Sequence, residues 1–194
     1  MGTATKISFS FFICFILILI TGCQHKDDKN SERHAKSLST HIGEKFELSN
    51  IVDSTGQQIA LDFNKSRITI IDLWFNECPP CIEEMKQFKE ILTGKENKVS
   101  IISISINNFN LWKKTLVDHT DRFSFLNNRA PNWVQYNLRS NEDEKLRNDI
   151  PFDRQAELVT KYNITFFPAF FVVDTDGIIQ SRPVSAVQFI KDLK

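Results

Sequence analysis

The sequence carries no excess of charge of either sign, because Lys and Arg number 24 and Asp and Glu also number 24 in 194 residues. Nucleic-acid binding leans on basic side chains that neutralise phosphates, so nothing here indicates a nucleic-acid partner. Glycine and proline are few, at six each, which excludes a collagen-like or low-complexity chain. What remains is the composition of one ordinary globular domain, 41% hydrophobic and 25% charged.

No apolar run is long enough to cross a bilayer as a helix, which takes about 20 residues. The longest run, residues 11–20, follows Lys6 near the start of the chain, an order typical of a signal peptide. It ends in Ile20-Thr21-Gly22-Cys23, which resembles the lipobox of bacterial lipoproteins. We therefore expect residues 1–22 to be a signal peptide; a plain secretory signal with a chance cysteine is the alternative.

The lipobox resemblance implies that Cys23 carries lipid on its sulfur and anchors the protein to a lipid bilayer. Residues 24–39 are polar and charged without an apolar period, so residues 23–39 are expected to form the anchor and a flexible tether. The expected location is the cell envelope, facing the periplasm or the cell exterior. The folded domain then comprises residues 40–194.

Cysteine is scarce, with four in the chain. Cys14 lies inside the expected signal and Cys23 would carry lipid, which leaves Cys78 and Cys81 as thiols in an oxidising compartment. Cysteines so close in sequence close only a small loop, so a structural disulfide would add little stability. Half of a zinc site is the other possibility, but no second cysteine pair or histidine cluster completes it.

The apolar pattern predicts strands that alternate with helices, the order of an α/β sheet. Mostly apolar runs predict buried strands at residues 68–75, 99–106 and 166–173. Apolar residues at helical spacing predict helices at residues 82–92 and 111–116.

Two segments fall outside this alternation. Residues 46–48 and 59–61 flank a turn signal at residues 53–56, which predicts a hairpin-like N-terminal β extension. Between about residues 127 and 151 the pattern is lost, so we expect an insertion before the last buried strand.

The segment from Trp74 to Cys81, Trp-Phe-Asn-Glu-Cys-Pro-Pro-Cys, resembles the active site of the thioredoxin superfamily. Within that superfamily it is similar to the membrane-tethered branch of TlpA-like and cytochrome c maturation proteins, over about residues 40–183 apart from the insertion. The resemblance also rests on the hairpin-like lead, on Glu84, on Phe167-Pro168 and on the Asp176-Gly177 turn. It implies a thioredoxin-like fold and a thiol–disulfide oxidoreductase that needs no cofactor besides a redox-active Cys78–Cys81 disulfide.

Disulfide exchange requires one thiolate that attacks and a second thiol that resolves the mixed disulfide. Because a helix N-terminus favours an anion, Cys78 is the expected nucleophile and Cys81 the resolving thiol. Glu77 departs from the family pattern, which usually has an aromatic or small residue just before the first cysteine. A negative charge beside Cys78 would oppose the ionisation of its thiol unless the Glu77 side chain points into water.

Two carboxylates are further candidates for catalysis. Asp72 stands where thioredoxins carry a buried Asp, although the tethered branch more often has Asn there. A buried carboxyl has a raised pKa and could accept the proton of Cys81. Glu84 lies three residues after Cys81, on the same helix face, where the resemblance implies proton handling; an exposed helix charge is the alternative.

Pro168 matches the cis-proline of the family, and the backbone of Phe167 would then pair with an extended substrate chain. The alternative is an ordinary trans proline at the start of a strand. The remaining residues expected at the substrate surface are Trp74, which could equally belong to the core, Pro79 and Pro80.

The expected function is that of a reductant or redox relay for protein disulfides, supplied by an upstream membrane electron donor. Strong oxidants stabilise their reduced form through a very acidic thiol, whereas Glu77, Asp72 and Glu84 all disfavour an additional thiolate charge. The alternatives are a disulfide oxidase or isomerase, a non-enzymatic metal-binding lipoprotein, and a scaffold that binds a partner through the insertion.

Overall fold

The computed structural model describes residues 31–120, 122–139 and 156–193. The chain divides into two compact units, Met1–Ser37 and Leu38–Lys194. Residues 31–38, expected to belong to a flexible tether, are helical. The segment has no apolar period, but its Glu, Arg, Ala, Lys and Leu residues have a high intrinsic helix propensity. The expected signal peptide and Cys23 lie outside the described residues. Within the described ranges no helix is long and apolar enough to span a membrane.

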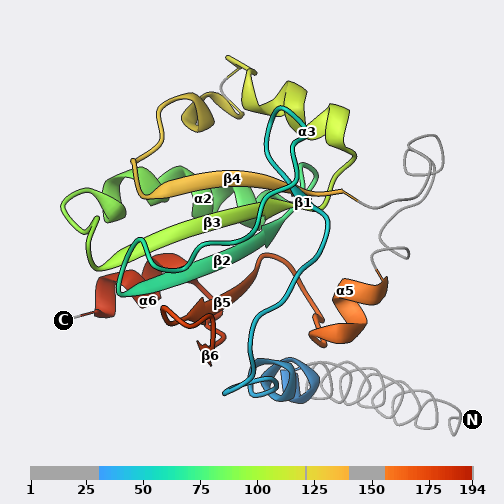
Figure 1. Ribbon diagram of the computed structural model, residues 1–194, viewed down its shortest axis with the longest axis vertical. Coiled ribbons are helices and arrows are strands. Elements are labelled where there is room, and N and C mark those ends of the chain that lie inside the picture. The colour runs from blue at the N-terminus through green and yellow to red at the C-terminus, as the bar shows by residue number, and fades with distance from the viewer. Residues whose placement is uncertain (1–30, 121, 140–155, 194) are drawn as a thin grey trace, which may run out of the picture. The chain divides into compact units, whose positions relative to one another are not determined.

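The second unit is built on a six-stranded sheet in the order β1-β4-β3-β2-β5-β6 (Figure 1). Strands β2, β3 and β4 run parallel, while β1, β5 and β6 each pair antiparallel with their neighbours. Their bounds are Ile51–Val52 for β1, Ile68–Trp74 for β2, Val99–Ser105 for β3, Trp133–Leu138 for β4, Ala169–Val173 for β5 and Ile179–Ser181 for β6. The predicted α/β architecture is confirmed, and the predicted strands correspond to β2, β3 and β5.

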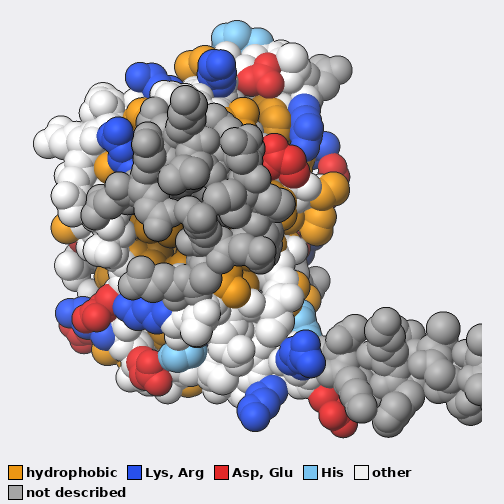
Figure 2. All heavy atoms as spheres, turned by 90° about the vertical axis from the view of Figure 1, so that its right-hand side faces the viewer, with side chains coloured by type: hydrophobic (Ala, Val, Ile, Leu, Met, Phe, Trp, Pro, Cys, Tyr) orange, Lys and Arg blue, Asp and Glu red, His pale blue; other side chains and the backbone are white. Residues whose placement is uncertain are grey.

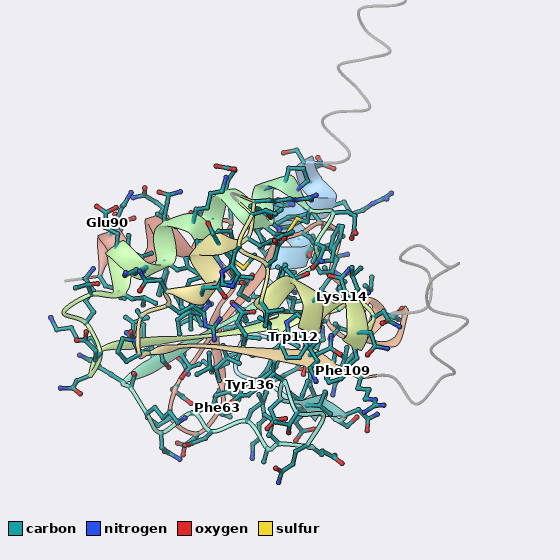
Figure 3. All side chains as sticks on the ribbon, turned by 90° about the horizontal axis from the view of Figure 1, so that it is seen from above. Phe63, Glu90, Phe109, Trp112, Lys114 and Tyr136 are labelled. Atoms are coloured by element: carbon teal, nitrogen blue, oxygen red, sulfur yellow. A yellow bond between two sulfur atoms is a disulfide. The ribbon has the colours of Figure 1, made fainter. Side chains whose placement is uncertain are left out.

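Helices cover both faces of this sheet. The helices are α2 at Pro79–Leu92, α3 at Phe109–Leu116, α5 at Ala156–Lys161 and α6 at Ala186–Asp192, with a short 3-10 turn at Ser124–Asn127. On one face α2, α3 and α6 share a core that includes Met85, Trp112 and Ile190. On the other face α5 contributes Leu158 to a second core, beside Tyr162. Figure 1 shows α2 passing behind the central strands, and Figure 3 shows Phe109 and Trp112 of α3 beside β4.

Residues 133–138, which the sequence pattern placed in the expected insertion, form β4, paired with β3 on one side and β1 on the other. The residues of β4 buried on the α2 face are Trp133, Gln135 and Asn137. Polar residues thus occupy two of these three inward positions, which hides the alternation that normally indicates a strand. The remainder of the expected insertion, residues 140–151, lies outside the described part of the chain.

The N-terminal β extension exists, but its strand is shorter and shifted. The predicted turn at Asp53 is confirmed, because its Oδ1 accepts hydrogen bonds from the N–H groups of Thr55 and Gln57 at 2.8 and 3.1 Å. Beside this turn the paired strand is β1, whose Ile51 lies opposite Leu138 of β4. Residues 46–48 and 59–61, which were predicted to flank the hairpin turn, do not pair with each other. The N–H of Phe46 instead donates a hydrogen bond to the carbonyl of Gly177.

Candidate active site

The cysteine pair lies where β2 ends and α2 begins, at the edge where the parallel strands present their carboxyl ends. Ligand sites of open α/β sheets favour this edge. Cys78 is the N-cap of α2, and the two prolines occupy its first positions, where a missing N–H costs no helical hydrogen bond. Cys78 and Cys81 form a disulfide (Figure 3, yellow bond). The N–H of Cys81 also points at the Cys78 sulfur, at 3.3 Å.

The two cysteines differ in exposure in the way that their expected roles require. Cys78 is 4% exposed and Cys81 is 0% exposed, while Pro79 and Pro80 lie on the surface. Cys78 is therefore the slightly more accessible of two buried cysteines. Since the helix N-terminus also favours a thiolate at Cys78, the geometry supports Cys78 as the nucleophile and Cys81 as the resolving thiol.

Asp72 is buried in β2, at 1% exposure, on the sheet face that α2 covers. Its neighbours on that face, Ile70 and Trp74, share a core with Cys81. Burial raises the pKa of Asp72 to about 7; the hydrogen bond from Ser103 opposes this shift and the negative charge of Glu84 adds to it. A carboxyl with a pKa near neutrality can take up and release a proton under working conditions.

Glu84 is held between two helices, one turn after Cys81. Its Oε2 accepts a hydrogen bond from the N–H of Val187, at 3.1 Å, in the first turn of α6. The side chain is partly buried and its charge reaches Asp72. The charge of Glu84 therefore acts on Asp72, and its hydrogen bond to α6 makes Glu84 more than an exposed helix charge.

Glu77, which departs from the family pattern, is exposed. Asn107, just beyond β3, donates from Nδ2 to its carboxylate at 3.2 Å. The side chain is solvated, so its charge opposes ionisation of Cys78 only weakly.

The predicted cis peptide is confirmed between Phe167 and Pro168, directly before β5. The rings of Phe167 and Phe75 meet edge to face with centroids 5.5 Å apart, which places the proline loop beside the cysteine loop. Trp74 is fully buried in the core. Its expected place at the substrate surface is therefore wrong, whereas Pro79 and Pro80 are exposed there.

The amide groups of Asn76 and Asn107 order the loop that carries Cys78, and the sequence alone did not single them out. Asn107 accepts the backbone N–H of Asn76 at 2.7 Å, and the Asn76 side chain donates to Thr115 at 2.6 Å. Arg122 donates to the Asn76 carbonyl at 2.6 Å. One signal for them is present in the sequence: both are polar residues that closely follow a buried strand. In open α/β sheets, binding sites form at the carboxyl ends of the strands.

Ser103 and Trp133 are two further residues that the sequence did not reveal. Ser103 donates a hydrogen bond to Asp72 at 2.7 Å, and Trp133 donates from its indole to Ser103 at 2.9 Å. These contacts join β2, β3 and β4. They depend on the register between the strands, which could not be predicted from the sequence pattern.

Comparisons with known proteins agree with this geometry. The family model described as Redoxin matches residues 41–188. Sporulation thiol-disulfide oxidoreductase A of Bacillus subtilis is 23% identical over 130 residues, which cover 66% of each chain. Thiol-disulfide oxidoreductase ResA of Bacillus cereus is 23% identical over 144 residues, 74% of this chain and 69% of that protein.

Solved structures show the same fold at low identity. A thiol:disulfide interchange protein from Bacteroides sp. superposes with a TM-score of 0.57 at 20% identity, over 80% of this chain and 88% of its own. The thioredoxin domain of a thiol-disulfide oxidoreductase from Bacteroides vulgatus gives a TM-score of 0.52 at 18% identity, over 79% and 95%. With a thioredoxin-like fold, a disulfide at the N-terminus of α2 and a family model that matches most of its length, the chain belongs to the Redoxin family.

Proposed function

We propose that this protein is a thiol–disulfide oxidoreductase that acts as a reductant or redox relay for protein disulfides through Cys78 and Cys81. The observation that carries the proposal is the disulfide at the start of α2, beside the loop of the cis proline Pro168. The relatives from Bacillus are named thiol-disulfide oxidoreductases, which supports the same chemistry here.

The surface beside Cys78 suits an extended polypeptide. Pro79 and Pro80 are exposed, and Phe75 and Phe167 are partly exposed. The Phe167 backbone at the cis proline would pair with a substrate strand, as in strand addition. Figure 2 faces this end of the molecule, where both hydrophobic and charged side chains are visible.

Reduction of a substrate disulfide then proceeds in two exchanges. The Cys78 thiolate attacks one substrate sulfur, which forms a mixed disulfide and releases the other substrate sulfur as a thiolate that takes a proton from water. The Cys81 thiol passes its proton to the Asp72 carboxylate and attacks the Cys78 sulfur. This step forms the Cys78–Cys81 disulfide and releases the second substrate sulfur as a thiolate, which also takes a proton from water, so that two electrons have moved to the substrate.

The carboxylates favour the reducing direction. Strong oxidants stabilise their dithiol form through a very acidic thiol, and the charges of Asp72 and Glu84 work against an additional negative charge at the sulfurs. An upstream membrane electron donor would return the oxidised pair to the dithiol, with no cofactor besides the disulfide itself. A lipid anchor at Cys23 would hold the protein in the cell envelope beside that donor, as in the branch that serves cytochrome c maturation.

The test uses the variants Cys78→Ala and Cys81→Ala with a model protein disulfide. Cys78→Ala should lose all exchange, because the nucleophile is gone. Cys81→Ala should accumulate a mixed disulfide at Cys78, measurable by intact mass, because nothing resolves it. Full exchange by either variant would exclude the proposed chemistry, and tight metal binding by the parent at neutral pH would favour the metal-binding alternative.

The direction of electron flow follows from the equilibrium with glutathione, measured on the parent protein. We expect a potential near that of thioredoxin, about −270 mV, and far from the about −120 mV of a strong oxidant. A value close to the latter would contradict the reductant and support a disulfide oxidase.

A further inference from the structure

A row of three side chains crosses the sheet on the face that α2 covers. Asp72 of β2, Ser103 of β3 and Gln135 of β4 are in register on adjacent parallel strands. Ser103 is 0% exposed and donates to Oδ2 of Asp72 at 2.7 Å. The other carboxylate oxygen, Oδ1, has no hydrogen-bond partner in the described part of the chain. Ser103 is therefore the contact through which the fold supports a charge on Asp72.

Trp133 fixes the direction of the bond between Ser103 and Asp72. Its indole nitrogen lies 2.9 Å from the Ser103 oxygen, and an indole N–H can only donate. The serine oxygen must accept from the tryptophan, so the single proton of the serine hydroxyl is left for Asp72. The ring of Trp133 is itself held, 5.2 Å from Phe88 and 6.3 Å from Phe125 between centroids.

Among the described residues Ser103 is the one hydrogen-bond donor to Asp72. Across the sheet β5 places Phe170 opposite Asp72. From α2 the titratable groups are Cys81, tied in the disulfide, and Glu84, whose charge raises the pKa of Asp72. The charged residues of α3 and α6 are exposed: Lys113, Lys114, Lys191 and Asp192.

We propose that Ser103, oriented by Trp133, is a positioning residue that stabilises the carboxylate form of Asp72 so that it can accept the proton of Cys81 at neutral pH. The inference rests on the proposed function for its role, but the contact itself can be tested without turnover. In the resolving step the Cys81 S–H bond breaks, the proton goes to Asp72, and the sulfur–sulfur bond to Cys78 forms as the substrate thiolate leaves. Loss of the serine hydroxyl would leave a larger fraction of Asp72 protonated at neutral pH and so slow this step.

The first measurement is the titration of the Asp72 carboxyl carbon by NMR in the oxidised protein, where the cysteines do not titrate. Ser103→Ala removes only the hydroxyl and should raise the midpoint by about one pH unit, the effect of one hydrogen bond to a charged group. Ser103→Thr keeps the hydroxyl and should restore the parent midpoint. Trp133→Phe removes the indole N–H and should move the midpoint upward by a smaller amount.

The matched control is Ser100→Ala on the same strand. The Ser100 hydroxyl is buried and lies 2.9 Å from that of Thr69, its in-register neighbour on β2. This variant loses a hydroxyl contact between the same two strands, but on the opposite face of the sheet. It should leave the Asp72 midpoint unchanged.

The second measurement is the pH dependence of the resolving step, followed as decay of the mixed disulfide. At pH 7 Ser103→Ala should be about fivefold slower than the parent, since the ionised fraction of Asp72 falls from about one half to about one tenth, and its profile should move to higher pH. A parent midpoint in Ser103→Ala, an equal shift in Ser100→Ala, or an unshifted rate profile would overturn the inference. A shifted midpoint in a protein without exchange activity would support the contact and exclude the proposed function.

Discussion

Asp72 is a residue that the fold stabilises in its protonated form. Its pKa is raised to about 7 in the folded protein, mainly by burial, from 3.8 for an exposed Asp. Between these values the folded protein binds more protons than the unfolded chain, so stability falls as pH rises from about 4 to about 7. Above that range the full cost of a buried charge remains. The proposed transfer of a proton from Cys81 would account for a buried carboxyl with this cost.

Asp72→Asn should therefore stabilise the protein, and the gain should grow with pH. At pH 5 both side chains are uncharged in the folded protein, while at pH 8 only the parent buries a charge. The difference in unfolding free energy between the two pH values should be on the order of a few kcal/mol, since each unit of pKa shift corresponds to about 1.4 kcal/mol. Urea denaturation of the oxidised parent and variant at both pH values measures it.

Asp118→Asn is the control for this comparison. Asp118 is partly exposed, and hydrogen bonds from Thr120 hold the pKa of its carboxyl below the usual value. Its carboxylate is charged at both pH values in both states, so its effect on stability should not change between pH 5 and pH 8. An equal pH dependence in the two variants would show that the effect does not come from the burial of Asp72.

At the scale of elements, α6 depends on a contact from α2. The helix has seven residues, and a helix this short is not stable by itself in water. Ser185 caps one of its orphan N–H groups by accepting from Gln188 at 3.1 Å. Glu84 satisfies another, that of Val187, from the neighbouring helix. The same side chain thus connects the active-site helix to the last helix of the domain.

Glu84→Ala should cost about 1 kcal/mol of stability, because it leaves a partly buried N–H without its acceptor, and should speed amide exchange in α6. Glu84→Gln keeps an acceptor oxygen and should lose about half as much. The control is Glu83→Ala: Glu83 is exposed and paired with Lys86 at 2.7 Å, a contact worth a few tenths of a kcal/mol. Equal losses at the two positions would contradict the connection between the helices.

The elements that could be predicted from the sequence were those in which burial and apolar character coincide. Helix α2 shows five buried positions at helical spacing, and β3 is buried along its whole length. Strand β4 was missed because Gln135 and Asn137 face inward, and polar side chains at buried positions break the pattern. The helix at residues 31–38 was missed for the opposite reason: propensity rather than an apolar face predicts it.

At the scale of the whole molecule, the active site joins segments that are far apart in the sequence. The cysteines and Asp72 were predictable because they lie within ten residues of one another, and Pro168 because a family resemblance placed it. Ser103 and Trp133 approach Asp72 only through the register of three strands. Such register is fixed by the packing of the whole sheet, which the sequence pattern does not express.

The last prediction concerns where the protein lies in the cell, which we expect to depend on lipidation of Cys23. Acyl chains on Cys23 would hold the protein stably at a lipid bilayer. We expect the parent to fractionate with membranes in a bacterial host that processes lipoproteins. Cys23→Ser should accumulate as an uncut or unlipidated precursor.

Cys14→Ser is the matched control, because Cys14 lies inside the apolar run rather than at its end. Its product should be cut and lipidated like the parent. Its measured mass should equal that of a mature protein that starts at Cys23 and carries the lipid. A parent protein that stays in the soluble fraction with Cys23 unmodified would exclude the anchor. The alternative would then be a plain secretory signal, and the electron donor would have to reach a freely diffusing protein.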